Sequence, residues 1–158
     1  VTHLEAFAAG AQTTPEVRED LLTAAYFLEE RGRLEAALGA FSRLKAASRD
    51  AETGFHYAYA LALLARPREA LQAYLDVAYT SSSAEWALTS RYRAAELMVR
   101  LGRREDAVAL YRELASRSEG TVQGDYALRR LAELSPSPEP ETAAPLEDPA
   151  HAPAPAPR

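Results

Sequence analysis

The architecture of this chain is clearest in residues 94–114, AAELMVRLGRREDAVALYREL, which predict a helix, a tight turn and a second helix. Ala95, Met98 and Leu101 fall on one stripe at helical spacing, and another apolar stripe follows Gly102 at the same spacing. Gly102 ends the first helix, because glycine adopts the left-handed backbone conformation without steric strain. Neither helix buries its stripe alone, so we expect an antiparallel pair that packs against further helices.

The composition of the 158 residues favours an all-helical domain with a real core. Hydrophobic residues, mostly Ala and Leu, make up 47% of the chain, and only seven residues are Gly. The net charge of −5 argues against a general nucleic-acid surface, since phosphate binding needs an excess of cations. The chain has no cysteine and no apolar run of about 18 residues, so we expect neither disulfides nor a membrane span. No signal-peptide pattern is visible, and a bacterial cytoplasmic or periplasmic location stays open.

Helix starts and stops divide the rest of the chain in the same way. Thr14-Pro15-Glu16 is typical of a helix start, and Gly32 is typical of the end of that helix. A second helix is expected at Leu34–Ala47, and Asp50 and Pro67 begin the next two. A closing helix is expected over about 125–134, with its inward side chains at Tyr126, Leu128, Leu131 and Leu134.

The termini differ from this pattern. Residues 1–14 predict either a short N-terminal helix or a frayed segment. Residues 135–158 hold eight of the ten prolines, so they predict a disordered Pro-rich tail rather than part of a core. The expected folded domain is therefore 15–134. The tail is expected to act as a solvated linker or, in the less favoured alternative, as a docking peptide.

A repeated motif links three successive helix pairs. The turn residues Gly32, Ala65 and Gly102 are each followed five residues later by Ala and four residues further on by an aromatic side chain, giving the pairs Ala37/Phe41, Ala70/Tyr74 and Ala107/Tyr111. The small residue lets two helices approach closely, and the aromatic ring fills the space between neighbouring pairs. Self-similarity at a fixed period is typical of a helical solenoid.

On these residues the chain resembles a tetratricopeptide repeat (TPR) array over about 18–134. The A-x3-F half of the family pattern is present three times, whereas the W-x2-L-G-x2-Y half is degenerate and keeps only its small residue, as Ala25, Ala58 and Ala95. The run from Tyr74 to Leu134 also resembles the longer-loop TPR arrays of bacterial envelope proteins, such as the Tol–Pal-associated and outer-membrane assembly types. The resemblance implies an all-α, right-handed α-solenoid of three helix pairs with a C-terminal capping helix.

The resemblance also implies a binding surface, because the first helix of each TPR pair lines a concave groove for peptides or partner helices. Carried over by repeat alignment, the expected partner-binding residues are Tyr26, Phe55, His56, Tyr59, Leu63, Tyr92, Arg93 and Glu96. Phe55, Tyr59 and Leu63 share one helical face at i, i+4 and i+8, which predicts an aromatic groove floor. The family's Lys/Asn carboxylate clamp is not expected, since Leu22 and Tyr26 stand at its first-pair positions.

Catalytic and metal chemistry find little support in the sequence. His56 lies one helical turn after Glu52, a spacing that would suit a general acid–base pair, but no nucleophile accompanies them. The three histidines are scattered and no Gly-rich phosphate loop is present, so we expect no metal and no cofactor. The sequence predicts a non-enzymatic protein–protein interaction adaptor or scaffold within a bacterial assembly, with the envelope as one candidate setting. The alternative is a structural or oligomerisation module of a longer protein that docks through its terminal helices.

Overall fold

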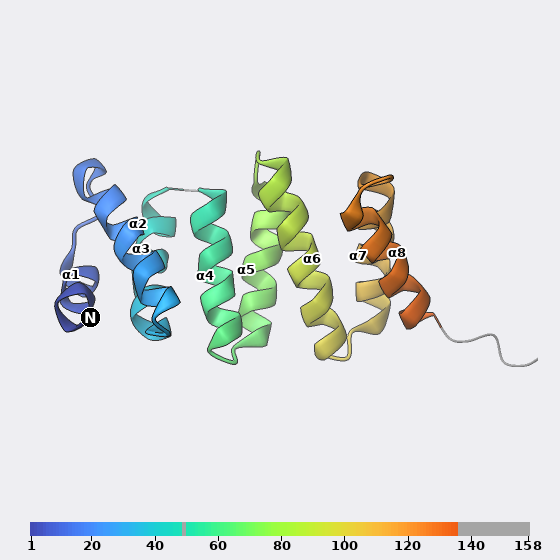
Figure 1. Ribbon diagram of the computed structural model, residues 1–158, viewed down its shortest axis with the longest axis horizontal. Coiled ribbons are helices and arrows are strands. Elements are labelled where there is room, and N and C mark those ends of the chain that lie inside the picture. Colours follow the sequence, from blue (N-terminus) through green and yellow to red (C-terminus); the bar gives the residue numbers. More distant parts are fainter. Residues whose placement is uncertain (49, 136–158) are drawn as a thin grey trace, which may run out of the picture.

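The computed structural model describes residues 1–48 and 50–135, which form eight helices and no strand. They follow one another along the row seen in Figure 1: α1 (Thr2–Gly10), α2 (Pro15–Glu30), α3 (Leu34–Ala47), α4 (Ala51–Leu63), α5 (Pro67–Thr80), α6 (Ala84–Arg100), α7 (Arg104–Arg117) and α8 (Val122–Leu134). None of the described helices is long and apolar enough to cross a bilayer.

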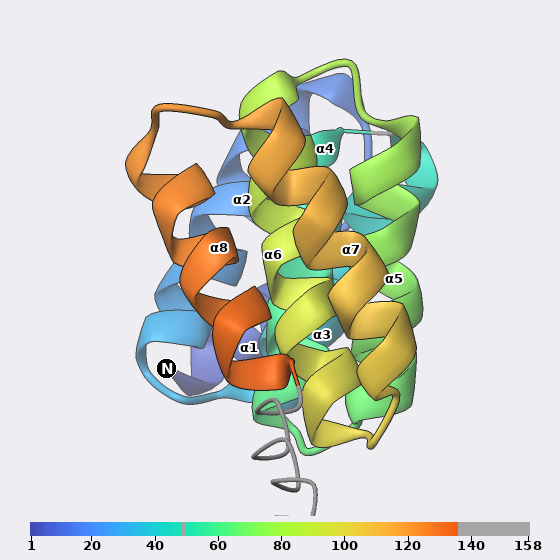
Figure 2. The same ribbon diagram turned by 90° about the vertical axis from the view of Figure 1, so that its right-hand side faces the viewer.

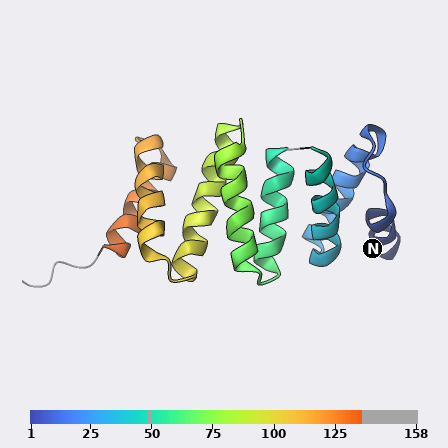
Figure 3. The ribbon, with the colours of Figure 1, turned by 180° about the vertical axis from the view of Figure 1, so that it is seen from behind.

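The helices are arranged in two layers. Helices α2, α4, α6 and α8 form one layer and α3, α5 and α7 form the other, as the end-on view in Figure 2 and the rear view in Figure 3 show. Each helix packs against the next along the chain, and α4 also touches α6. The surface formed by α2, α4, α6 and α8, which faces the viewer in Figure 1, is called the first-helix face below.

The repeated motif builds the core between the layers. Ala37, Ala70 and Ala107 are fully buried, and so are the aromatic partners Phe41, Tyr74 and Tyr111. Ala25, Ala58 and Ala95, the small residues of the first helices, are buried opposite them. A solenoid of three helix pairs and a closing helix is therefore confirmed, because each pair buries its stripe against its neighbours.

The turns inside the three pairs share one backbone conformation. Gly32, Ala65 and Gly102 have φ angles of 70°, 57° and 75°, in the left-handed region. Each turn is closed by a backbone hydrogen bond from the next residue to the fifth residue before it, as from Arg103 to Met98 at 2.8 Å. Only the middle pair places a residue with a Cβ in this conformation.

The N-terminal segment contains a helix that packs onto the first pair. Helix α1 contacts both α2 and α3, and Ala8 is buried in the core that they share. Arg33 pairs with Glu5, and Arg43 donates to the carbonyl oxygen of Ala9 at 3.1 Å. The sequence-based boundary at residues 14 and 15 stays a prediction. The expected Pro-rich tail lies outside the described residues, apart from Ser135.

The closing helix corrects two sequence-based expectations. It begins at Val122 rather than near Asp125, and the Thr121 hydroxyl caps it by accepting from the Gly124 amide at 3.1 Å. Leu128, expected to point inward, is 57% exposed. The reason is that α8 ends the array and packs on one side only, through a stripe that includes Gly124 and Ala127.

Candidate functional site

The predicted partner-binding residues all lie on α2, α4 and α6 and fall into two groups. Tyr26, Phe55 and His56 belong to a cluster where α2, α4 and α6 meet, called the His56 cluster here. Tyr92, Arg93 and Glu96 line a pocket between α6 and α8. Tyr59 lies beside the first group, and Leu63 is 47% exposed at the last turn of α4.

Two hydrogen bonds tie α2 to α4 in the His56 cluster. The Tyr26 hydroxyl donates to Glu52 Oε1 at 2.7 Å, and His56 Nδ1 lies 2.8 Å from Glu29 Oε2. The spacing of His56 and Glu52 within α4, which had little support from the sequence as an acid–base pair, does not join the two residues, since each has its hydrogen-bond partner on α2. Burial raises the pKa of the Tyr26 hydroxyl, and its bond to Glu52 raises it further. Both pairs hold neighbouring repeats together.

Aromatic packing fills the rest of this cluster. The His56 ring packs edge-on against Tyr26, with ring centroids 4.7 Å apart, and stacks on Phe41 at 5.5 Å. Trp86 at the start of α6 lies 5.0 Å from the ring of Phe55. Trp86 is therefore a packing residue between repeats.

Phe55 was expected on an open groove floor, but the structure places it in a covered position. It is only 8% exposed, because Trp86 of the next pair and Tyr74 of its own pair cover its ring. Tyr59 stacks parallel to Phe55 at 6.5 Å and is half-buried. Of the three aromatic and aliphatic residues on this stripe of α4, only Tyr59 and Leu63 are accessible on the first-helix face.

One acceptor in the His56 cluster has no donor. The side chain of Glu29 is 10% exposed, and its Oε1 atom has no hydrogen-bond partner within the part of the chain that the structure describes. A buried acceptor without a donor is costly in folding free energy. Because this oxygen is buried, it belongs to the packed interface between α2 and α4 and not to an open binding surface.

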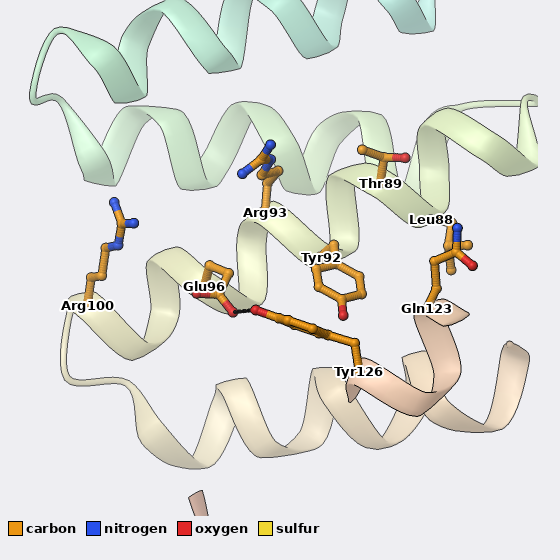
Figure 4. Close-up of a pocket in the computed structure, with 8 residues that line it drawn as sticks. All are labelled: Leu88, Thr89, Tyr92, Arg93, Glu96, Arg100, Gln123 and Tyr126. Atoms are coloured by element: carbon orange, nitrogen blue, oxygen red, sulfur yellow. Dashed lines mark hydrogen bonds between the residues drawn. The ribbon is translucent and has the colours of Figure 1, made fainter. Parts of the chain in front are cut away.

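The second group opens a pocket of about 440 Å³ between α6 and α8. Figure 4 shows the residues that line it, among which the rings of Tyr92 and Tyr126 pack against one another with their centroids 4.8 Å apart. Arg93 and Arg100 lie on α6 along one side. The complete lining is Leu88, Thr89, Tyr92, Arg93, Glu96, Arg100, Gln123 and Tyr126.

Glu96 organises this pocket but is not free to bind a ligand cation. Its Oε1 atom accepts from Tyr126 Oη at 3.1 Å, from Arg130 Nε at 3.1 Å and from the Tyr111 hydroxyl. Burial alone would raise the pKa of Glu96, but these hydrogen bonds and the Arg130 charge outweigh it, so the pKa lies below its usual range. The carboxylate is therefore ionised and neutralised within the protein.

The pocket is left with a surplus of positive charge. Arg93 and Arg100 are exposed and form no ion pair within the described residues, whereas Glu96 is already matched by Arg130. A guanidinium group binds a carboxylate through two parallel hydrogen bonds. Together with the tyrosine rings, the two arginines can hold an anionic group that is attached to an apolar one.

Sequence reasoning missed the contribution of α8. Tyr126 was expected as a core residue, and neither Gln123 nor Arg130 was assigned a role, yet all three contact the pocket or its central carboxylate. The available signal was the position of α8 itself. A closing helix continues the layer of first helices, so the groove register could have been extended across it.

The comparisons with known proteins match this chain to solved structures, and not to a family model or a curated protein. No family model matches the chain, and no curated protein matches it. A crystal structure of PcrH from Pseudomonas aeruginosa superposes with a TM-score of 0.62 at 17% identity, covering 78% of this chain and 92% of that one. The structure of PcrH in complex with the chaperone binding region of PopB gives the same TM-score and identity, with 77% and 97% coverage. This chain therefore has the TPR-like helical-repeat fold.

Proposed function

We propose that this chain is a non-enzymatic interaction module that binds an extended peptide or a partner helix on its first-helix face. The observation that carries the proposal is the α6–α8 pocket, where an open volume of about 440 Å³ is lined by two tyrosine rings and by two arginines that form no ion pair among the described residues. Aromatic anchors beside charged groups are the residues that dominate protein interfaces. Similarity of fold to PcrH, crystallised with the chaperone binding region of PopB, is consistent with a peptide ligand.

Catalysis is not part of the proposal. The candidate base His56 is packed between aromatic rings and held by Glu29, where it links two repeats. A general base needs a proton to abstract from a substrate within hydrogen-bond reach. The half-buried, hydrogen-bonded setting of His56 instead fits a structural role.

The cellular assembly in which this proposed adaptor acts stays a prediction. The resemblance of residues 74–134 to TPR arrays of the bacterial envelope suggests a place in an envelope assembly, and the PcrH likeness suggests a bacterial origin more generally.

The proposal can be tested with a displayed library of random twelve-residue peptides, selected against the full chain. We expect the Tyr59→Ala, Tyr92→Ala, Arg93→Ala variant to lose the selected sequences, with binding at least about tenfold weaker. The control is Arg68→Ala, Arg112→Ala, which removes exposed arginines from α5 and α7 in the opposite layer. Equal binding by the first-helix variant and the parent would refute the proposed surface.

A second function is favoured by the ends of the array. Val122 and Leu128 on α8 are 79% and 57% exposed, and Phe7 and Phe27 border an apolar pocket between α1 and α2. Apolar side chains at both ends suit a structural module that docks end to end. A Val122→Ser, Leu128→Ser variant would lower the sedimentation coefficient at high concentration if this were so, and an unchanged coefficient would reject it.

A further inference from the structure

The pocket between α6 and α8 specifies a ligand of particular chemistry. Its apolar wall comes from Leu88 and the tyrosine rings, and its charge comes from Arg93 and Arg100. The acid within it, Glu96, is matched by Arg130 and does not cancel that charge. The best occupant therefore carries one aliphatic side chain directly beside one or two carboxylates.

This chain contains such a segment. Residues 145–149 read Pro-Leu-Glu-Asp-Pro, in which a single leucine precedes two consecutive acids. Residues 136–158 hold four acids, while their only arginine or lysine is Arg158. We propose that Leu146, Glu147 and Asp148 of the same chain dock in the α6–α8 pocket, with the leucine against the apolar wall formed by Leu88 and the paired tyrosine rings and the acids on Arg93 and Arg100.

The length of the connecting chain allows this docking. Helix α8 ends at Leu134, and about twelve residues separate it from Leu146. Twelve extended residues span up to about 40 Å. Tyr126 lies eight residues before Leu134 on the same helix, a distance of about 12 Å along its axis. The segment therefore reaches the pocket with slack, and it needs no second copy of the protein.

Two physical effects favour the contact. Pro145 and Pro149 restrict the backbone on both sides of the segment, so less conformational entropy is lost on docking. Tethering gives a segment on a short flexible linker an effective concentration on the order of millimolar. A contact that is weak between free molecules is then mostly formed within one chain, and an incoming partner must displace it.

This inference is independent of the proposed function, because docking of the tail requires the pocket but no external partner. Its test is nuclear magnetic resonance of the 15N-labelled full chain. We expect the amide signals of Leu146–Asp148 to shift in an Arg93→Gln, Arg100→Gln variant. The matched control, Arg68→Gln, Arg112→Gln, makes the same change in net charge on the opposite layer and is expected to leave those signals unmoved.

A variant of the tail segment tests the same contact without altering the pocket, so its result does not depend on correct folding of the pocket variant. Leu146→Ser, Glu147→Gln, Asp148→Asn alters no residue of the helices, and it should shift the amide signals of the pocket residues Tyr92, Arg100 and Tyr126. A labelled peptide of residues 142–152 should bind this tail variant about tenfold more tightly than the parent chain, since the competing segment is gone.

Three outcomes would overturn the inference. Identical signals of residues 146–148 in the parent and the pocket variant would show that the arginines do not hold the segment. Equal peptide affinity of the parent and the tail variant would show that the segment does not compete. Loss of the tail shifts on tenfold dilution would assign the contact to a second copy of the chain instead.

Discussion

Glu96 on α6 and Tyr126 on α8 are joined by a hydrogen bond of 3.1 Å that closes the inner wall of the pocket (Figure 4). The same carboxylate oxygen accepts from Tyr111 of α7 and from Arg130. One side chain therefore connects three consecutive helices at the C-terminal end of the array. It also fixes the two groups, Tyr126 and Arg130, that shape the binding pocket.

Removal of this carboxylate should destabilise the last repeat. Glu96→Ala leaves the buried Tyr111 hydroxyl without its acceptor, and the Arg130 guanidinium keeps only the exposed Glu133 as an ion-pair partner. Because the site is partly exposed, we expect a loss of about 2 kcal/mol in the free energy of unfolding in urea. Glu119→Ala, which removes an exposed acid from the α7–α8 loop, is the control. A loss no larger than that of the control would contradict the connecting role of Glu96.

The lowered pKa of Glu96 predicts that the folded chain loses stability in acid. The folded-state pKa of this residue is depressed by its hydrogen bonds, so the unfolded chain binds a proton more readily and stability rises with pH. The stabilisation is fully present above the ordinary carboxyl pKa of about 4.3 and is lost as the pH falls through the lower folded value. The difference in unfolding free energy between the parent and Glu96→Gln should therefore shrink below about pH 4. A difference independent of pH would argue against ionisation of Glu96.

The backbone conformation of the turn at Ala65 predicts how a substitution there changes stability. Its φ of 57° lies in the left-handed region that Gly32 and Gly102 occupy in the equivalent turns. A Cβ in this conformation costs roughly 1–2 kcal/mol, while glycine adds about 0.5–1 kcal/mol of entropy to the unfolded state. Ala65→Gly should therefore stabilise the chain by about 0.5–1 kcal/mol, measured by urea unfolding. Gly102→Ala should have the opposite sign, and loss of stability in Ala65→Gly would contradict the argument.

Much of the fold could be predicted because the motif is local. The turn, the alanine and the aromatic residue of each pair lie within ten residues, and the burial of Ala37, Ala70 and Ala107 follows from helix crossing alone. Contacts between pairs were harder to foresee. Phe55 is covered by Trp86, which is thirty-one residues away, and helical spacing gives no sign of it.

The candidate site also combines features that local sequence predicts with contacts between helices that it does not predict. Repeat alignment named Tyr92, Arg93 and Glu96 as partner-binding residues, and all three line one pocket, although their binding role stays a prediction. Helical spacing brought His56 near Glu52 in sequence, whereas the hydrogen bond of His56 runs across the helix interface to Glu29. The roles of Tyr126 and Arg130 depend on where α8 docks, which is a tertiary relationship that no local pattern contains.

Two glycines in helices should respond oppositely to alanine. A Cβ on Gly124 would lie 2.1 Å from the Ser118 carbonyl oxygen, so the α7–α8 loop would have to move. Nothing lies within 4 Å of a Cβ on Gly39, which is exposed within α3. We expect Gly39→Ala to raise stability by about 0.5–1 kcal/mol. Gly124→Ala should lower it by at least about 1–3 kcal/mol, as overpacking does. Similar melting temperatures for the two variants would show that α8 does not dock as described.

The tyrosines predict the behaviour of the chain in alkali. Burial raises the pKa of Tyr26, Tyr74, Tyr92 and Tyr111, and the carboxylates beside Tyr26 and Tyr111 raise it further. Each of these hydroxyls ionises more readily in the unfolded chain, so the stability they contribute is fully present below about pH 10 and falls as the pH rises beyond that value.

A spectrophotometric titration of tyrosinate absorbance should therefore show only part of the eight tyrosines ionising while the helices remain folded. The rest should ionise together with the loss of helical circular dichroism, because unfolding exposes them to water. The same chain in concentrated urea is the control, and there all eight should titrate in one step near pH 10, roughly the model-compound value. A single step near that pH in the folded chain would show that these hydroxyls are not buried, and with them the packing of the pocket wall would have to be revised.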